Sequence, residues 1–565
     1  VSNNNGGRVA ESASHPRSSI EKCTTYDTEL FSVAPMMAHT NRHYRYFWRL
    51  FSSRTFLYTE MIPASQIVAA YDRELARLGM DKGSGGDTDD IRPEEILEVL
   101  HRIQGMEYDN HNRESPSRTN GRGNVESLYE LLCSAEQNHG TLDSHRCRGP
   151  TQDYTILQIG GKDPHILAKA SAIGAAFGSA NNPTYSSINL NCGCPSNAVS
   201  GRSGGASLMK EPSHVAKCVE AMNRAVTDMY HFESHDNNGD GGITPLSVKH
   251  RLGVRDAATY NVQEDKLKID EDEAFPECCE FIRAIGLTGD VHKFQVHARL
   301  GLLGDFESDD NDLPRARSQQ QLWVPESSGK AAIKSQSTPK VDHKRAQYKA
   351  KKRARKATIQ NRSVPPLRPG VVDLLANEFP RLEFVANGGI QSMTAVQNRV
   401  YKRSSDNDVI GAMVGRSAIN HPCSFAGADA LWDGNGYNEE SRGSSLPSRG
   451  DVLLQFIQYC EQEEDRVKSM GVNINSLAAL RRRLVAVPFH LFVGERGDNV
   501  YQRRIRKLAS RAERYTAKAM LLAAFNEVPD ESINRSVGDF TNIEKLGVHN
   551  YGGVERSGPL QKSIH

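Results

Sequence analysis

The sequence predicts a parallel α/β barrel followed by a helical domain. Short runs rich in β-forming apolar residues recur along the first three quarters of the chain, and amphipathic helix-like stretches follow several of them. The runs are continuous, without polar alternation, which is typical of strands buried on both faces of a parallel sheet. After about residue 445 only helical periodicity remains. Eight strand–helix units are the number that closes a TIM (β/α)8 barrel.

The eight expected strands are separated by helices or by long polar insertions. The runs cover residues 31–34, 56–62, 154–159, 187–191, 244–249, 294–297, 382–386 and 409–414. The clearest helices between them are 164–176 and 214–225. An open doubly wound sheet is the alternative. No G-x-G-x-x-G motif follows the first strand, which weighs against a Rossmann domain.

The expected domain boundaries follow the changes in pattern. The barrel is expected over residues 28–445, with insertions at about 66–150, 230–243 and 306–363. The helical domain is expected over 446–528, because apolar residues recur at three- and four-residue spacings in 451–462, 475–486 and 503–524. Residues 1–27 are polar, and are expected to be a disordered tail or the remnant of a transit peptide. Residues 529–565 are expected to be a second tail.

Composition excludes several classes of protein. The chain holds ten cysteines, and no CxxC pair is matched by a second one, so we expect reduced thiols and no zinc site. No run of 18 apolar residues exists, so no membrane-spanning helix is predicted. The formal net charge is +1, but Lys and Arg gather in the helical domain and in residues 340–362. Such runs are either solvated tails or phosphate-binding surfaces.

Chemically distinctive residues follow the predicted strands, where a barrel places its active site. Glycines after strands seven and eight predict a phosphate site, although ordinary turns are the alternative. Lys249 ends an apolar strand, and a buried lysine requires an anion or an electron-rich ring such as a flavin, unless it extends to the rim. The strand-end residues are Pro35, Met36, Gln158, Asn191, Cys194, Lys249, His297, Arg299, Asn387, Gly389, Gly415 and Arg416.

An ordered series of motifs at these strand ends resembles a known family. In order, the strings are SVAPMMAHTNRHYRYFWRLFS, LYTEMI, LQIGGKDP, INLNCGCPS, VKHRLG, VHAR, NGGI and MVGRSAINHP, spanning residues 31–425. They are similar to the tRNA-dihydrouridine synthases, and within them to the A-type subfamily. The string HLFVGERGDNVYQRRIRKLAS in the helical region also resembles that subfamily's tRNA-binding domain.

The resemblance implies an FMN-dependent reductase that uses NADPH and acts on tRNA uridines, at positions 20 and 20a of the D-loop. It assigns FMN contacts to Pro35, Met36, Gln158, Lys249, His297, Asn387, Gly389, Gly415 and Arg416. It assigns catalysis to Cys194, a substrate or flavin contact to Asn191, and RNA contacts to Arg299, Arg503 and Arg504. A monomer in the cytoplasm is expected, with a plastid or mitochondrion as the alternative.

The implied chemistry suits a thiol acid. Hydride from reduced flavin reaches C6 of uracil and makes C5 basic, so an acid must protonate C5. A thiol with its reference pKa of about 8.5 is protonated at neutral pH. Cys192, two residues before Cys194, is expected to be a packing residue.

Two departures from the family concern RNA docking. Leu300 stands where a lysine is common, and Gly204 where a phenylalanine is common. One alternative function is a flavin dehydrogenase of free pyrimidines or dihydroorotate, which the basic helical domain argues against. The other is an RNA-binding protein on a barrel that no longer catalyses a reaction, which the intact Cys194, Lys249 and His297 argue against.

Overall fold

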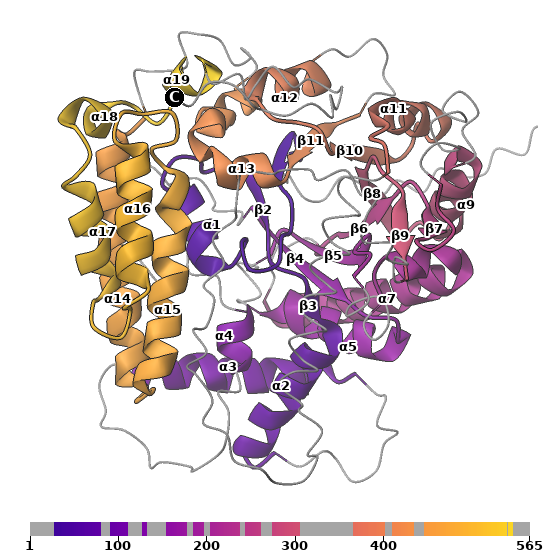
Figure 1. The fold of residues 1–565 in the computed structure, drawn as a ribbon. Coiled ribbons are helices and arrows are strands. Elements are labelled where there is room, and N and C mark those ends of the chain that lie inside the picture. The colour runs from indigo at the N-terminus through magenta and orange to yellow at the C-terminus, as the bar shows by residue number, and fades with distance from the viewer. Residues whose placement is uncertain are drawn as a thin grey trace, which may run out of the picture.

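Eight parallel strands close into a barrel in the computed structural model (Figure 1). The structure describes residues 28–80, 91–110, 127–132, 154–177, 185–196, 204–237, 243–261, 274–304, 365–401, 409–433, 446–539 and 541–545. The barrel strands are β1 (Phe31–Val33), β2 (Phe56–Tyr58), β4 (Thr155–Gly160), β5 (Ser187–Cys192), β6 (Leu246–Arg251), β8 (Val291–His297), β10 (Glu383–Asn387) and β11 (Gly411–Val414). Pairing of β1 with β11 and of β2 with β4 closes the ring, so the predicted barrel is confirmed.

The register of the strands brings the predicted site residues to one rim. Asn191 lies opposite Lys249, and His297 lies opposite Asn387. Asn387 in turn lies opposite Met413 of β11. Because all these pairings are parallel, the carboxyl ends of the strands meet at the same end of the barrel.

The predicted strand over 56–62 is two shorter strands. β2 ends at Tyr58, and the chain pairs again as β3 (Ile62–Pro63), where Ile62 lies opposite Ile159 near the end of β4. The sixth barrel strand begins at Val291, three residues before the expected start, because charged and polar residues there still pair with β6 and β10. Apolar content alone therefore underestimated the length of that strand.

At least one helix follows each barrel strand. These helices are α1 (Arg42–Arg49), α2 (Ala64–Arg77), α5 (Pro164–Ala176), α7 (Pro212–Asn237), α9 (Ala274–Gly286), α11 (Pro369–Glu378), α12 (Met393–Val400) and α13 (Arg416–Asn420). Asp163 caps α5 by accepting hydrogen bonds from His165 N and Ile166 N. Gly174 lets α5 approach the sheet, because a Cβ there would lie 2.5 Å from Leu157 Cδ2.

Part of the expected insertion at 66–150 belongs to the barrel. α2 begins at Ala64, and it is the helix between the second and third barrel strands. α3 (Pro93–Asn110) and α4 (Leu128–Leu132) bury Val99 and Leu128 in the same apolar core. α7 continues to Asn237, into the expected insertion at 230–243. The expected tail over 1–27 and the expected insertion over 306–363 lie outside the described residues.

Short elements complete the barrel. β7 (Val254–Asp256) and β9 (Gly301–Leu303) pair in parallel beyond the ends of β6 and β8. Three short 3-10 helices are η1 (Ala206–Lys210), η2 (Pro422–Phe425) and η3 (Ala428–Trp432). η1 lies in the loop between β5 and α7, and it packs against β5, β6, β7 and β9.

The helical region contains seven helices among its described residues. They are α14 (Arg449–Ser469), α15 (Ile474–Ala486), η5 (Val487–His490), α16 (Asp498–Ala509), α17 (Ala517–Phe525), α18 (Asp530–Asn534) and α19 (Thr541–Lys545). The expected single helix over 503–524 is two helices, because the Thr516 side chain accepts from Ala519 N and caps α17. The fold also continues beyond residue 528, where Val537 and Ile543 are buried instead of belonging to a tail.

The helical region is packed onto the barrel through α1 (Figure 1). Tyr46 of α1 stacks on Tyr459 of α14 with ring centroids 4.0 Å apart, and His43 Nδ1 lies 2.7 Å from the Tyr459 hydroxyl. Arg42 pairs with Glu463 at 2.9 Å. One apolar cluster runs from Phe31 of β1 to residues of α16. The barrel and the helical region therefore share a core.

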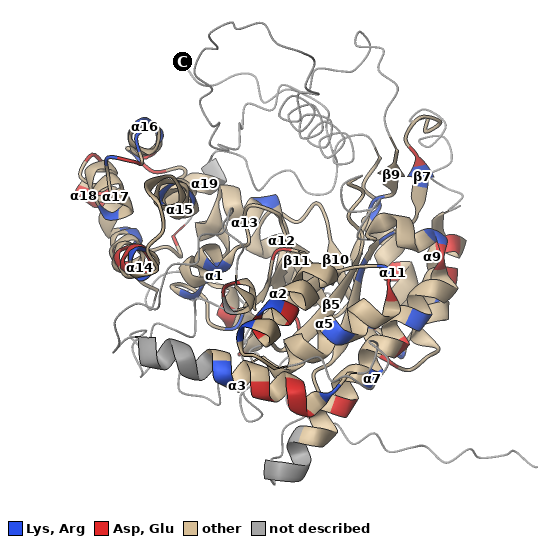
Figure 2. Cartoon of the chain, turned by 90° about the horizontal axis from the view of Figure 1, so that it is seen from below, with Lys and Arg blue, Asp and Glu red and all other residues tan. Residues whose placement is uncertain are grey.

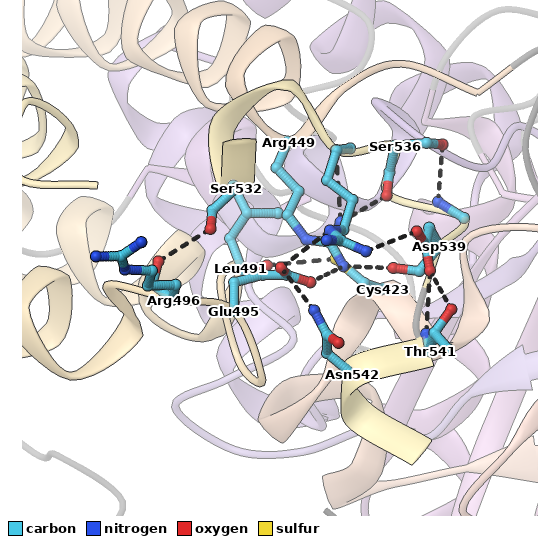
Figure 3. Close-up of polar contacts among 12 residues, drawn as sticks. Cys423, Arg449, Leu491, Glu495, Arg496, Ser532, Ser536, Asp539, Thr541 and Asn542 are labelled. Carbon is cyan, nitrogen blue, oxygen red and sulfur yellow. Dashed lines mark hydrogen bonds and ion pairs between the residues drawn. The ribbon is translucent and has the colours of Figure 1, made fainter. Parts of the chain in front are cut away.

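A buried ionic cluster attaches the C-terminal helices to α14 (Figure 3). This cluster, the Arg449 cluster, consists of Arg449, Glu495, Arg535 and Asp539. Arg449 Nη2 lies 3.2 Å from Glu495, and both side chains are almost completely buried. Arg535 pairs with Glu495 at 3.1 Å and with Asp539 at 2.9 Å. Arg449 also donates hydrogen bonds to the carbonyl oxygens of Ser536 and Asp539.

Candidate active site

The loop after β5 carries two cysteines in different surroundings. Cys192 is completely buried in the apolar core, and burial raises the pKa of its thiol. Cys194 is partly exposed. The prediction that Cys192 is a packing residue is confirmed, because successive residues of a strand point to opposite faces and Cys192 points outward to the helices.

Asn191 sets the course of this loop. Its Oδ1 accepts hydrogen bonds from the backbone N–H groups of Gly193 and Cys194, both at 3.0 Å. This local arrangement is one for which Asn side chains are favoured. The carbonyl oxygen of Cys194 then accepts from Ala206 N at 2.9 Å, which joins the loop to η1.

Arg251, which the sequence places at the end of a strand but to which no role was assigned, supports the same loop from β6. Its Nε donates to the carbonyl oxygen of Gly193 at 2.8 Å, and its Nη1 donates to the carbonyl oxygen of Leu300 at 2.8 Å. The side chain is 5% exposed, so these bonds are shielded from water. A charged residue at the end of a buried strand is the sequence signal that could have identified it.

Gln158 lies beside Asn191 at the ends of β4 and β5. Asn191 Nδ2 donates to Gln158 Oε1 at 2.9 Å, and Gln158 N is bonded to the Thr59 hydroxyl. Gln158 is 1% exposed and Asn191 7% exposed. The two side-chain carboxamides are therefore held in fixed positions next to Cys194, as their places at neighbouring strand ends predict.

Lys249 extends across the barrel to β10. Its Nζ donates to Asn387 Oδ1 at 3.2 Å, and Asn387 Nδ2 donates to the carbonyl oxygen of Met413 at 2.9 Å. Burial is the largest cause that lowers the pKa of Lys249, to about 7, and the nearby Arg251 lowers it further. A neutral amide as the partner does not offset the cost of burying the ammonium, so an anionic or electron-rich partner fits this position.

His297 at the end of β8 lies at the rim beside the two glycines that follow β10. Burial, followed by the charges of Arg251 and Lys249, holds the pKa of His297 well below its usual range, so the imidazole is neutral at pH 7. Gly388 and Gly389 have φ of +118° and +73°. A Cβ on Gly388 would lie 3.2 Å from His297 Cδ2, so the loop passes close to this ring.

The loop after β11 lies next to the loop after β1. A Cβ built on Gly415 would lie 3.9 Å from Met36 Sδ, which places Met36 beside the start of α13. Pro35 and Met36 are partly exposed, and Arg416 is exposed. The positive charge of Arg416 also contributes to lowering the pKa of His297.

The three expected RNA contacts differ in their exposure. Arg299 is 6% exposed, and its Nη1 donates to the carbonyl oxygen of Pro365, so its position does not support an RNA contact. Arg504 pairs with Glu527 at 3.2 Å, whereas Arg503 is exposed on α16. Arg481, which the basic pattern of the helical region included, is buried against Glu464.

The two departures from the family have local structural reasons. Leu300 is 3% exposed and packs in the barrel core, near Gly253, so this position presents no side chain to the surface. Gly204 has φ of +82°, and a Cβ there would lie 2.5 Å from the Gly161 carbonyl oxygen. A side chain at position 204 therefore requires a different course of this loop.

Within the described ranges, no three His, Cys, Asp or Glu side chains come close enough to hold a metal ion. The same residues contain no helix that is both long and apolar enough to cross a membrane.

Comparison with known proteins agrees with this geometry. The family model described as dihydrouridine synthase (Dus) matches residues 32–85 and 125–320. A tRNA-dihydrouridine(20/20a) synthase of Synechocystis is 25% identical over 449 residues, covering 79% of this chain and 83% of the relative. Proteins of the same name from Pseudomonas syringae and Escherichia coli K12 are 26% and 25% identical, covering 81% and 72% of this chain and 89% and 71% of the relatives.

Proposed function

This chain belongs to the dihydrouridine synthase family, a family of oxidoreductases, and from that premise we propose that it reduces uridines of tRNA to 5,6-dihydrouridine. The proposed cofactor is FMN and the proposed reductant is NADPH. The proposed targets are positions 20 and 20a, which the names of the relatives state for those proteins. The observation that carries the proposal is the partly exposed Cys194 at the barrel mouth, next to Gln158, Asn191 and Lys249.

The rim fits a flavin mononucleotide. Lys249 suits the pyrimidine edge of the ring, which gains negative charge on reduction, and Gln158 offers amide groups to the same ring. Gly388 and Gly389 after β10, together with Gly415 and Arg416 after β11, suit the phosphate. In such barrels the loops after the seventh and eighth strands bind phosphate through backbone N–H groups. Pro35, Met36, His297 and Asn387 line the space between these two ends.

Cys194 is the proposed acid. The flavin supplies hydride for C6 of the uracil ring, after which C5 must receive a proton. Asn191 and Arg251 hold the backbone around Cys194, so the thiol is presented from a fixed loop. Its Sγ–H gives the proton to C5, and a thiol protonated at neutral pH is suited to that step.

We infer that the helical region binds the tRNA backbone. Its exposed cations among the described residues are Lys468, Arg483, Arg496, Arg503, Arg506, Lys507, Arg511 and Arg514. Contacts to phosphate supply most of the affinity of such proteins, and the target uridine must be turned out of the folded tRNA to reach Cys194. A dehydrogenase of free pyrimidines or dihydroorotate does not require this basic surface.

The assignment is tested with the purified full chain. It should carry flavin absorbance, oxidise NADPH, and form dihydrouridine in unmodified tRNA. Equal reduction of free uracil or dihydroorotate would favour the alternative dehydrogenase, and a flavin-free protein that binds tRNA would favour a barrel without activity. Mapping dihydrouridine in the product tRNA decides between positions 20, 20a and others.

We predict that the affinity for FMN falls as the pH rises above about 7. The pKa of Lys249 in the protein without ligand is about 7, and an electron-rich or negatively charged group of the bound FMN raises it, so binding takes up a proton above that pH. The dissociation constant should then rise by up to about tenfold per pH unit above pH 7. Quenching of FMN fluorescence measures this dependence. Lys249→Met should bind FMN more weakly and no longer show this dependence; an unchanged slope in that variant contradicts the assignment.

We predict that Arg503→Glu with Arg506→Glu weakens tRNA binding by at least about tenfold, because two attractions to phosphate become repulsions. The negative slope of log affinity against log salt concentration should also become shallower, by about 0.7–0.9 for each phosphate that is no longer neutralised. The matched control is Arg224→Glu with Arg283→Glu on α7 and α9, which lie across the molecule from α16 (Figure 2). Equal effects in both double variants would remove the helical region as the specific tRNA surface. FMN content should stay the same in all of them.

A further inference from the structure

The barrel interior contains an unbroken chain of hydrogen-bonded polar side chains. From the mouth inward, Asn191 Nδ2 donates to Gln158 Oε1 at 2.9 Å, and Gln158 Nε2 donates to Asn189 Oδ1 at 2.8 Å. Asn189 Nδ2 donates to Gln295 Oε1 at 2.8 Å, and Gln295 Nε2 donates to Glu29 Oε2 at 3.3 Å. We call these five residues the carboxamide chain. None is more than 7% exposed.

The outer end of the carboxamide chain has only one possible direction. Asn191 Oδ1 faces the backbone N–H groups of Gly193 and Cys194, which can only donate. Asn191 must therefore donate through Nδ2, and Gln158 must accept through Oε1. Each carboxamide has one accepting and one donating side, so this direction passes to the next residue.

The inner end requires the same direction. The Glu29 side chain is completely buried, and its second oxygen accepts from the Tyr58 hydroxyl at 2.9 Å. Burial raises the pKa of Glu29, whereas Lys293 Nζ, 4.0 Å from its Oε2, and the hydrogen bonds from Tyr58 and Gln295 favour the carboxylate. A carboxylate only accepts, so Gln295 must donate to it. Both ends agree, and turning over any one carboxamide would oppose two like groups in a buried site, which is costly.

We propose that Asn189, Gln295 and Glu29 are positioning residues that act through this chain on the active site. They orient Gln158 so that the second N–H of its Nε2 is available to an acceptor atom of the flavin. They orient Asn191 so that its Oδ1 holds the Cys194 loop. The part that concerns the flavin rests on the proposed function. The direction of the chain does not.

Two substitutions test the direction. Asn189→Asp preserves shape and still accepts from Gln158, but it turns an oxygen toward Gln295 Oε1. Gln295 must then turn over, which opposes its oxygen to Glu29. Adding Glu29→Gln restores complementarity, because an amide at position 29 can donate to the turned Gln295 while still accepting from Tyr58. The double variant also carries the same net charge as the natural chain.

The measurements are the melting temperature of the flavin-free full-length protein, the dissociation constant for FMN, and the absorption spectrum of bound flavin. Asn189→Asp should lower the melting temperature, weaken FMN binding by at least about tenfold and alter the spectrum. The double variant should recover the melting temperature and bring FMN binding to within about threefold of the natural chain.

Ser247→Ala is the matched control. Ser247 accepts the other N–H of Asn189 at 2.9 Å, but it lies beside the chain and does not transmit its direction. FMN binding in this variant should stay within about threefold of the natural chain. If Asn189→Asp does not fold, recovery of folding in the double variant is the supporting result.

The outcomes separate the two proposals. If the natural chain binds FMN but Asn189→Asp binds it equally well, or if Glu29→Gln gives no rescue, the positioning proposal is overturned and the proposed function stands. If the natural chain binds no FMN, the proposed function fails. The melting temperatures alone then test the direction of the carboxamide chain. Rescue by Glu29→Gln supports that direction, and the absence of rescue overturns it.

Discussion

Replacing Cys194 with alanine should lower the rate of uridine reduction by about 10²–10⁴-fold, the usual contribution of a positioned general acid. The backbone of the loop should persist, because Asn191 and Arg251 hold it through the main chain and not through the thiol. FMN content and tRNA affinity should therefore remain. The measurement is the single-turnover oxidation of prereduced enzyme by unmodified tRNA, which isolates reduction of the uridine from the reaction with NADPH.

Two further variants make this result specific. Cys194→Ser retains a proton donor, but a hydroxyl is a weaker acid than a thiol, so the rate should stay close to that of the alanine variant. Cys192→Ala is the matched control, since Cys192 is buried in the core two residues away and should affect stability only. If Cys194→Ala reduced uridine at the same rate as the natural chain, another group would have to protonate C5.

Replacing Glu495 with alanine should reduce the free energy of unfolding by about 3–5 kcal/mol, the usual cost of removing one partner of a buried ion pair. Glu495 lies 3.2 Å from Arg449 and 3.1 Å from Arg535, and it accepts from Asn542 Nδ2 at 3.1 Å. Its removal leaves the completely buried guanidinium of Arg449 without a carboxylate partner. Denaturant unfolding measures the change.

The control for this prediction is an exposed ion pair of the same region. Glu461 pairs with Lys518 at 2.8 Å, with both side chains roughly half exposed, so Glu461→Ala should cost only about 0–1 kcal/mol. Glu495→Gln should fall between the two, because it retains hydrogen bonds without the charge. Equal costs for Glu495→Ala and Glu461→Ala would mean that the Arg449 cluster does not hold the C-terminal helices in place.

The sequence by itself determined the barrel, the order of its strands and the position of the loop for which a catalytic role is proposed. Continuous apolar runs mark strands that are buried on both faces, and glycines mark turns with positive φ, as at Gly388 and Gly389. Cys192 and Cys194 could be told apart because Cys192 stands at the end of an apolar strand, whereas Cys194 lies in the loop that follows. These are local properties, so they can be found without knowing what packs against the chain.

Only the tertiary structure decided which polar residues act together. Glu29 and Gln295 are separated by 266 residues, and their contact exists because β1 and β8 surround the same barrel interior. Arg299 looked like an RNA contact in its motif, but its guanidinium turns inward to the Pro365 carbonyl. Residues 529–545 looked like part of a tail, yet the Arg449 cluster and the buried Val537 and Ile543 hold their described part to the rest of the fold. Contacts between distant segments depend on closure of the barrel and on helix packing, which local periodicity does not encode.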